Sequence, residues 1–326
     1  MTAHPRPAAA GRSPHLTDRL DGLLFFPVTP FAPDGAPDLD AFRAHVRGGI
    51  DAGAGAVFAC CGTGEFHALA PEEYAACVAA AVAEAAGRVP VLAGTGYGTA
   101  LATHFARLAQ TAGADGLLAM PPYLVRADQP GLLRHYAALA AATALPVIVY
   151  QRDNAVFAPD TVAALARTPG VIGLKDGLGD LDLLQRIISA VRTDAAGLPF
   201  CYFNGLPTAE LTGPAYRGLG VRLYSSAVFA FAPEIALAFH RALDDGDDAT
   251  TTRLLDGFYR PLVELRNEGR GYAVSLVKAG VGLRGGPPVG GVRPPLSDPR
   301  PAHVERLARL LDHGLELAAA APGSGA

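Results

Sequence analysis

The sequence has few cysteines, little net charge and no long apolar run, and each shortage excludes a class of protein. No C-x-x-C pair occurs among the four cysteines, so zinc or dithiol redox sites of that kind are not indicated. With 27 basic against 31 acidic residues, the net charge of -4 offers no electrostatic footprint for nucleic acid or an anionic membrane. No uninterrupted apolar run approaches the roughly 18 residues that a membrane span needs.

These absences favour a small-molecule partner over a nucleic acid or a membrane. The cysteines, at positions 60, 61, 77 and 201, fit reduced and mostly buried thiols, so we expect a soluble, cytoplasmic protein. The first twenty residues contain basic residues and prolines but no apolar core of a signal peptide, so we expect a disordered tail over residues 1–20.

Short apolar runs alternate with alanine-rich helical stretches along most of the chain. The eight candidate strands are residues 22–28, 56–61, 89–94, 115–120, 145–150, 171–175, 199–204 and 221–226. They are apolar on successive residues, which is typical of parallel strands covered on both faces. We therefore predict an α/β fold, a (β/α)8 TIM barrel over residues 21–245.

Beyond the last candidate strand the apolar pattern is helical only. We expect residues 246–320 to form a C-terminal helical extension that packs on the barrel or on a neighbouring subunit. Residues 284–301 are too rich in glycine and proline for regular structure, and residues 321–326 should be a disordered tail.

Chemistry in this architecture belongs to the loops at the carboxyl ends of the strands. The segments found there are CCGTGE (60–65), GTGYG (94–98), PPYL (121–124), YQRDN (150–154), KDG (175–177), NG (204–205) and SS (225–226).

Lys175 follows a strand that reads as buried, and a buried ammonium must be paired or neutralised. One interpretation is a structural ion pair with Asp176 or another carboxylate. The other is a nucleophile whose pKa is lowered by desolvation, which suits Schiff-base formation with a carbonyl. Asp176 is a poor partner because successive strand residues face opposite sides.

Tyr150 ends the strand before that of Lys175. By itself it could be an ordinary strand-end aromatic, but beside a lysine it could carry protons to and from a bound substrate. Gly62, Thr63 and Gly64 form a tight turn whose backbone N–H groups and threonine hydroxyl could hold a carboxylate, although a plain glycine turn is an equal alternative.

Nothing in the sequence requires a metal or a cofactor. The GTGYG segment lacks both the G-K-[ST] ending of a P-loop and the spacing of a dinucleotide fingerprint. The nine histidines include no H-E-x-x-H motif and no carboxylate cluster at metal-ligand spacing.

In combination, the strand-end motifs resemble a known superfamily. FPVTPF, GTGE, PPY, a strand-five tyrosine followed by QRDN, and GLKDG occur in the order seen in the dihydrodipicolinate synthase and N-acetylneuraminate lyase superfamily of Schiff-base barrels. The resemblance covers about residues 20–320. It implies that Lys175 forms the imine, that Tyr150 is the acid and base, and that Gly62 with Thr63 binds a 2-oxo carboxylate.

Two positions depart from the synthases of this group. The synthases carry a second hydroxyl residue before the threonine and a second tyrosine after PY, where this chain has Gly62 and Leu124. Their proton relay is therefore absent. The segments GTGEF, RDNAVF, FNGLPTAE and LYSSAVFAF are instead similar to the 5-dehydro-4-deoxyglucarate dehydratases, which usually have asparagine where this chain has Gln151.

That likeness implies a decarboxylating dehydratase, acting on a 2-oxo sugar diacid without a cofactor, and a homotetramer or homodimer. Arg152 is the candidate for the distal carboxylate, or else it braces a loop through Asp153. Further candidates for binding substrate hydroxyls, or for hydrogen bonds within the loops, are Asn204, Gly205, Ser225 and Ser226. An aldolase or lyase for another 2-oxo sugar acid and a non-catalytic binding or regulatory barrel remain as alternatives.

Overall fold

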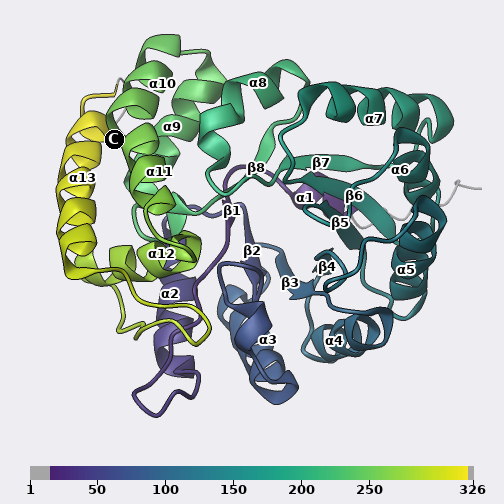
Figure 1. The fold of residues 1–326 in the computed structure, drawn as a ribbon, viewed down its shortest axis with the longest axis horizontal. Helices are drawn as coiled ribbons and strands as arrows, with labels where there is room; N and C mark the ends of the chain where they lie inside the picture. Colours follow the sequence, from purple (N-terminus) through teal and green to yellow (C-terminus); the bar gives the residue numbers. More distant parts are fainter. Residues whose placement is uncertain (1–14, 322–326) are drawn as a thin grey trace, which may run out of the picture.

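A computed structural model describes residues 15–321, and within them the strands close into a parallel barrel in chain order (Figure 1). The strands are β1 (Leu24–Phe25), β2 (Ala56–Ala59), β3 (Val91–Thr95), β4 (Gly116–Ala119), β5 (Val147–Gln151), β6 (Val171–Asp176), β7 (Cys201–Asn204) and β8 (Leu223–Ser226). All eight predicted strands are present, so the (β/α)8 prediction is confirmed. Strand β1 is shorter than predicted, because Pro27 has no N–H to donate to a neighbouring strand.

Alternation along each strand divides the apolar residues into two cores. One core fills the barrel interior and includes Leu24, Ala56, Phe58, Leu92, Leu118, Ile148 and Phe203. The larger core lies between the outer face of the strands and the surrounding helices. Because both faces of each strand are buried, the strands read as continuous apolar runs in the sequence.

The surrounding helices start and end where local signals indicate. They are α2 (Leu39–Asp51), α3 (Pro71–Ala85), α4 (Thr99–Thr111), α5 (Gln129–Ala141), α6 (Pro159–Ala166), α7 (Leu181–Asp194), α8 (Gly213–Gly218) and α9 (Pro233–Asp245). Asp38 and Asp180 cap α2 and α7 by accepting backbone N–H bonds. Helix α3 begins with Pro71, and Glu73 accepts a bond from the Ala70 N–H.

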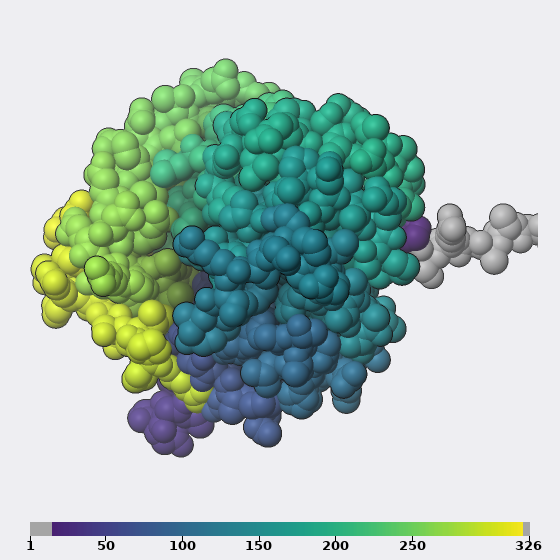
Figure 2. Space-filling model, turned by 45° about the vertical axis from the view of Figure 1, so that its right-hand side comes forward, coloured from purple at the N-terminus to yellow at the C-terminus, as the bar shows by residue number. Residues whose placement is uncertain are grey.

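Residues 246–320 are helical apart from one long loop. The elements are α10 (Asp248–Leu254), a π-helical turn η4 (Leu255–Tyr259), α11 (Arg260–Asn267), α12 (Tyr272–Leu283) and α13 (Pro301–Ala319). Helix α13, yellow in Figure 1, packs against α9, α11 and α12 on the outside of the barrel. The Gly/Pro-rich residues 284–300 form neither helix nor strand, as predicted, but Pro301, which the prediction included, begins α13. In Figure 2 the yellow C-terminal residues lie beside the purple and blue N-terminal part.

Ordered structure begins earlier than the sequence indicates. Helix α1 (Leu16–Arg19) and Leu20 fall inside the predicted tail of residues 1–20, which is a correction to that boundary. Leu20 is buried in the inner core, and Arg19 forms an ion pair with Asp115 at 2.9 Å. Ala321, which the predicted C-terminal tail of residues 321–326 included, is buried. The remaining residues of the two predicted tails, 1–14 and 322–326, lie outside the described residues. Over residues 15–321, no helix combines the length and apolar character needed to cross a bilayer.

Candidate active site

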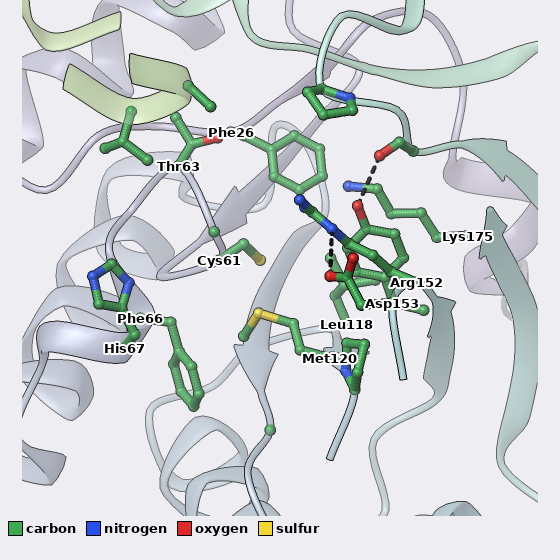
Figure 3. Close-up of a pocket in the computed structure, with 18 of the residues that line it drawn as sticks. Phe26, Cys61, Thr63, Phe66, His67, Leu118, Met120, Arg152, Asp153 and Lys175 are labelled. Atoms are coloured by element: carbon green, nitrogen blue, oxygen red, sulfur yellow. Dashed lines mark hydrogen bonds and ion pairs between the residues drawn. The ribbon is translucent and has the colours of Figure 1, made fainter. Parts of the chain in front are cut away.

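A cavity of about 480 Å³ opens at the carboxyl ends of the strands, at the position predicted for the chemistry. Several residues singled out in the sequence line it together: Gly62, Thr63, Tyr150, Arg152, Lys175, Gly205 and Ser225. Figure 3 shows Lys175 and Arg152 on one side of the cavity and His67 on the other, with Cys61 and Met120 between them. These residues come from at least five different strand ends, which the closed barrel brings to one mouth.

Lys175 points into the barrel mouth and is only 5% exposed. Its Nζ lies 4.1 Å from the ring centre of Phe26 and 4.7 Å from that of Tyr150. No carboxylate among residues 15–321 forms an ion pair with it. Burial without a counter-charge lowers the pKa of Lys175 to about 7. With this pKa, a substantial fraction of the Lys175 amine is neutral, and therefore nucleophilic, near neutral pH.

Asp176 faces the opposite side of strand β6, as the alternation of strand residues requires. Its carboxylate accepts hydrogen bonds from the Gln151 side chain at 3.0 Å and from the hydroxyl of Tyr216. The N–H groups of Leu178 and Gly179 also donate to it. This network fixes the loop after β6. The interpretation of Lys175 as an ion-pair partner of Asp176 is wrong.

Tyr150 is the register partner of Lys175 across strands β5 and β6. Its hydroxyl donates a 2.7 Å hydrogen bond to the carbonyl oxygen of Gly205, which holds the phenol beside the amine. Burial raises the pKa of Tyr150, and the Arg152 guanidinium partly opposes this increase. The phenol is thus protonated at neutral pH and able to donate a proton.

The turn at Gly62–Gly64 follows strand β2, and its residues Gly62 and Thr63 form part of the cavity wall. The N–H of Glu65 donates to the carbonyl of Gly62 at 3.1 Å, and the hydroxyl of Thr29 donates to the carbonyl of Gly64 at 2.7 Å. Gly64 itself does not line the cavity. It is needed for close approach, because a Cβ there would lie 3.1 Å from the Cα of Cys60 and 3.2 Å from the Pro27 carbonyl oxygen.

Arg152 lies at the cavity rim with 45% of its side chain exposed. Its Nε is 3.0 Å from a carboxylate oxygen of Asp153. The backbone of Arg152 also bridges to Ala155, which closes the loop after β5. The arginine is therefore both paired within its loop and open to the cavity. Gln151 points away from the cavity and links Asp176 to the loop N–H of Phe157.

Two predicted substrate-binding side chains lie outside the cavity lining. Asn204 donates to the carbonyl of Ala209 and to the hydroxyl of Thr212, so it makes the loop hydrogen bonds that were its alternative assignment. Ser226 is fully buried and donates to Glu210 at 2.6 Å. Their neighbours Gly205 and Ser225 line the cavity because adjacent strand residues face opposite ways.

Several residues of the cavity wall are not among the candidates predicted from the sequence. Cys61, His67 and Met120 come from loops near the motifs, and Cys61 could have been found as the residue before Gly62. Burial raises the pKa of Cys61 to about 12, so this thiol stays protonated. The C-terminal extension contributes Gly271, Ala273, Val274 and Leu296, for which no local sequence signal exists.

Curated proteins are similar to this chain over most of its length. Curated relatives include the "Probable 5-dehydro-4-deoxyglucarate dehydratase" of Streptomyces griseus, 74% identical over 307 residues that cover 94% of this chain and 96% of the relative. The protein of the same name from Bradyrhizobium diazoefficiens is 47% identical, with 89% of this chain and 91% of the relative covered.

Solved structures share the fold. Dihydrodipicolinate synthase from Oceanobacillus iheyensis superposes with a TM-score of 0.83 at 23% identity, covering 91% of this chain and 97% of that one. YagE, a prophage protein of E. coli K12 solved in complex with pyruvate, gives a TM-score of 0.78 at 26% identity, covering 91% and 98%. Residues 19–313 match the dihydrodipicolinate synthetase family. The chain belongs to this family.

Proposed function

We propose that this protein is a decarboxylating dehydratase that converts 5-dehydro-4-deoxy-D-glucarate into 2,5-dioxopentanoate, water and CO2 through a Schiff base on Lys175. The observation that carries the proposal is the buried Lys175 amine, without a carboxylate partner, beside the Tyr150 phenol in a cavity of about 480 Å³. The names of the close curated relatives supply the substrate.

The reaction begins with attack of the neutral Lys175 amine on the ketone carbon next to one carboxylate, and water leaves as the iminium forms. The iminium is an electron sink for the neighbouring CH2 group. Loss of one proton from that carbon gives an enamine, which then expels the β-hydroxyl as water and leaves a conjugated iminium.

Decarboxylation follows through the same conjugation. The bond to the far carboxylate breaks, CO2 departs, and its electron pair moves along the conjugated chain to the iminium nitrogen. Protonation of the resulting dienamine, hydrolysis of the imine and conversion of the terminal enol to an aldehyde release 2,5-dioxopentanoate and regenerate the amine. The net change is loss of one water and one CO2.

The candidate site residues have separate roles in the proposed reaction. Tyr150 transfers protons during imine formation and hydrolysis, and its hydrogen bond to Gly205 sets the direction of the phenol. The Gly62–Gly64 turn binds the carboxylate beside the ketone, with backbone N–H groups and the Thr63 hydroxyl as donors. The pyruvate complex of the relative YagE is consistent with a 2-oxo acid in this type of barrel.

Arg152 attracts the distal carboxylate to the cavity while its ion pair with Asp153 limits how tightly it holds that group. A tight clamp on a carboxylate that must leave would oppose decarboxylation. Ser225, at the end of β8, is the candidate donor for a substrate hydroxyl. A cytoplasmic location and a homo-oligomeric assembly complete the proposal.

The test is incubation of the purified protein with 5-dehydro-4-deoxy-D-glucarate, with CO2 and 2,5-dioxopentanoate measured together. Equal amounts of both products support the proposal. Release of pyruvate without CO2 would instead indicate retro-aldol cleavage. Borohydride reduction in the presence of the keto acid should leave a covalent adduct on Lys175, and a chain without any adduct would not be an imine enzyme.

A further inference from the structure

A second buried lysine, Lys278 on helix α12, lies behind the carboxylate-binding turn. Its side chain is 2% exposed, and its Nζ is 2.7 Å from an oxygen of Glu65, whose side chain is fully buried. The same ammonium donates a 2.8 Å hydrogen bond to the carbonyl of Gly291 in the Gly/Pro-rich loop. In contrast to Lys175, this lysine has a carboxylate partner and is a structural cation.

Glu65 is the residue through which this cation reaches the cavity. It directly follows Gly64, and its N–H closes the turn on the carbonyl of Gly62. Its backbone is left-handed, with φ 55 and ψ 40, a conformation that non-glycine residues adopt at a cost in free energy. Interactions of the side chain must therefore hold this backbone in place, and the contact with Lys278 is one of them.

Arg293 supplies the other contact from the loop between α12 and α13. The backbone N–H of Arg293 donates a 2.9 Å hydrogen bond to the second carboxylate oxygen of Glu65. Its guanidinium forms a two-point ion pair with Glu73 on helix α3 and also donates to the carbonyl of Ala68. Three residues beyond Arg293, Leu296 lines the cavity. The loop is thereby fastened to the same segment that carries the turn.

The ring of Phe31 lies beside both cations, 4.1 Å from the Nζ of Lys278 and 4.2 Å from the Cζ of Arg293. The backbone N–H of Phe31 donates to the carbonyl of Val289. The loop between β1 and α2, the turn after β2 and the loop between α12 and α13 therefore meet at one cluster. A buried ion pair of this kind is weak evidence for stability but restricts geometry, because breaking it leaves an unpaired charge.

We propose that Lys278 and Arg293, acting through Glu65, are positioning residues that set the geometry of the Gly62–Gly64 turn, so that the C-terminal extension controls affinity for the carboxylate next to the substrate ketone. This inference rests on the proposed Schiff-base function and assigns the extension a part in substrate selection. In this arrangement neither Lys278 nor Arg293 contacts the reacting atoms.

The experiment compares two carbonyl probes that differ in the carboxylate. Pyruvate has the carboxylate and hydroxyacetone lacks it, and capture of each by Lys175 is followed by borohydride reduction and intact mass over a range of concentrations. We expect Lys278→Met to raise the half-saturating pyruvate concentration by about tenfold or more, the equivalent of roughly 1.4 kcal/mol. Capture of hydroxyacetone should remain within about twofold of wild type, since that probe does not use the turn.

The controls separate positioning from general damage. Arg284→Met removes another cation that pairs with a carboxylate, Glu234, away from the cavity, and should change neither probe. Lys278→Arg keeps the charge and should recover part of the pyruvate affinity. If the single variant does not fold, the double variant Glu65→Gln, Lys278→Met replaces it, because it leaves no unpaired buried charge at this pair. The same selective loss of pyruvate affinity is expected for it.

Two results would overturn the inference. One is an equal loss of capture for both probes in the folded variants, which would mean that the pair only maintains the fold. The other is unchanged pyruvate affinity. If wild type captured neither probe, the Schiff-base function itself would fail, and this outcome is distinguishable because it appears before any substitution is made.

Discussion

Tyr150 and Lys175 are directly paired in register on strands β5 and β6, and the Lys175 Nζ lies 4.7 Å from the Tyr150 ring centre. Both side chains point into the barrel mouth, where the carbonyl oxygen of Gly205, directly after β7, accepts a hydrogen bond from the phenol. The proposed nucleophile and the proposed proton donor are thus fixed to adjacent rigid strands rather than to loops. This placement limits the motion of either group relative to the other.

Removing the Lys175 amine should abolish the reaction. Lys175→Met preserves the length and apolar character of the side chain, so the variant should fold while CO2 release and borohydride-trapped adduct both disappear. The measurement is CO2 release together with intact mass after reduction. An adduct that persisted in this variant would place the imine on another residue.

The rate of imine capture should depend on pH with an apparent pKa of about 7. Below that pH the amine is protonated and cannot attack, so capture rises as pH increases through 7 and is flat above it. A normal lysine would keep gaining up to about 10.4. Initial rates of pyruvate trapping between pH 5 and 10 check this, and a rise centred near 10 would contradict the assigned environment.

The same lowered pKa predicts a pH dependence of stability. Between pH 7 and the normal lysine value the unfolded chain binds more protons at this position than the folded one, so the free energy of unfolding rises with pH. Below pH 7 both states are protonated, and the buried charge lowers stability by a few kcal/mol. Denaturant unfolding should show that Lys175→Met is more stable at pH 6 and lacks this part of the pH slope.

Tyr150→Phe should lower turnover by about 10²- to 10⁴-fold, the usual range for loss of a positioned proton donor. The ring is retained, so the packing beside Lys175 stays, and slow imine capture should remain detectable. The measurement compares kcat with the fraction of Lys175 trapped by borohydride: kcat should fall while trapping remains detectable. Near-normal turnover in this variant would assign proton transfer to a different group.

Gly205→Ala should displace the side chain of Lys175. A Cβ at this position would lie 2.6 Å from both Cγ and Cε of Lys175 and 2.9 Å from the carbonyl oxygen of Asp176. We expect turnover to fall by about 10²-fold, since a displacement of roughly 1 Å at reacting groups has effects of that size. Gly218→Ala is the matched control, because nothing lies within 4 Å of its Cβ, and it should retain full activity.

The order of strands and the burial of Lys175 follow from the sequence alone. Eight runs that are apolar on successive residues specify parallel strands covered on both faces, and strand alternation excludes Asp176 as the partner of Lys175. The tight turn at Gly62–Gly64 is likewise a local feature, since glycine allows the close backbone approach found there. These conclusions can be read from the local pattern of residue types.

Tertiary structure alone decided which strand-end side chains share the cavity and what lies behind them. Asn204 and Ser226 form hydrogen bonds with the segment after β7 and do not line the cavity. Leu296, in contrast, reaches the cavity from a loop more than two hundred residues beyond the Gly62–Gly64 turn. The contact of Lys278 with Glu65 also joins segments far apart in the chain. Such contacts depend on barrel closure and on the path of the C-terminal loop, and no periodicity or local propensity encodes either.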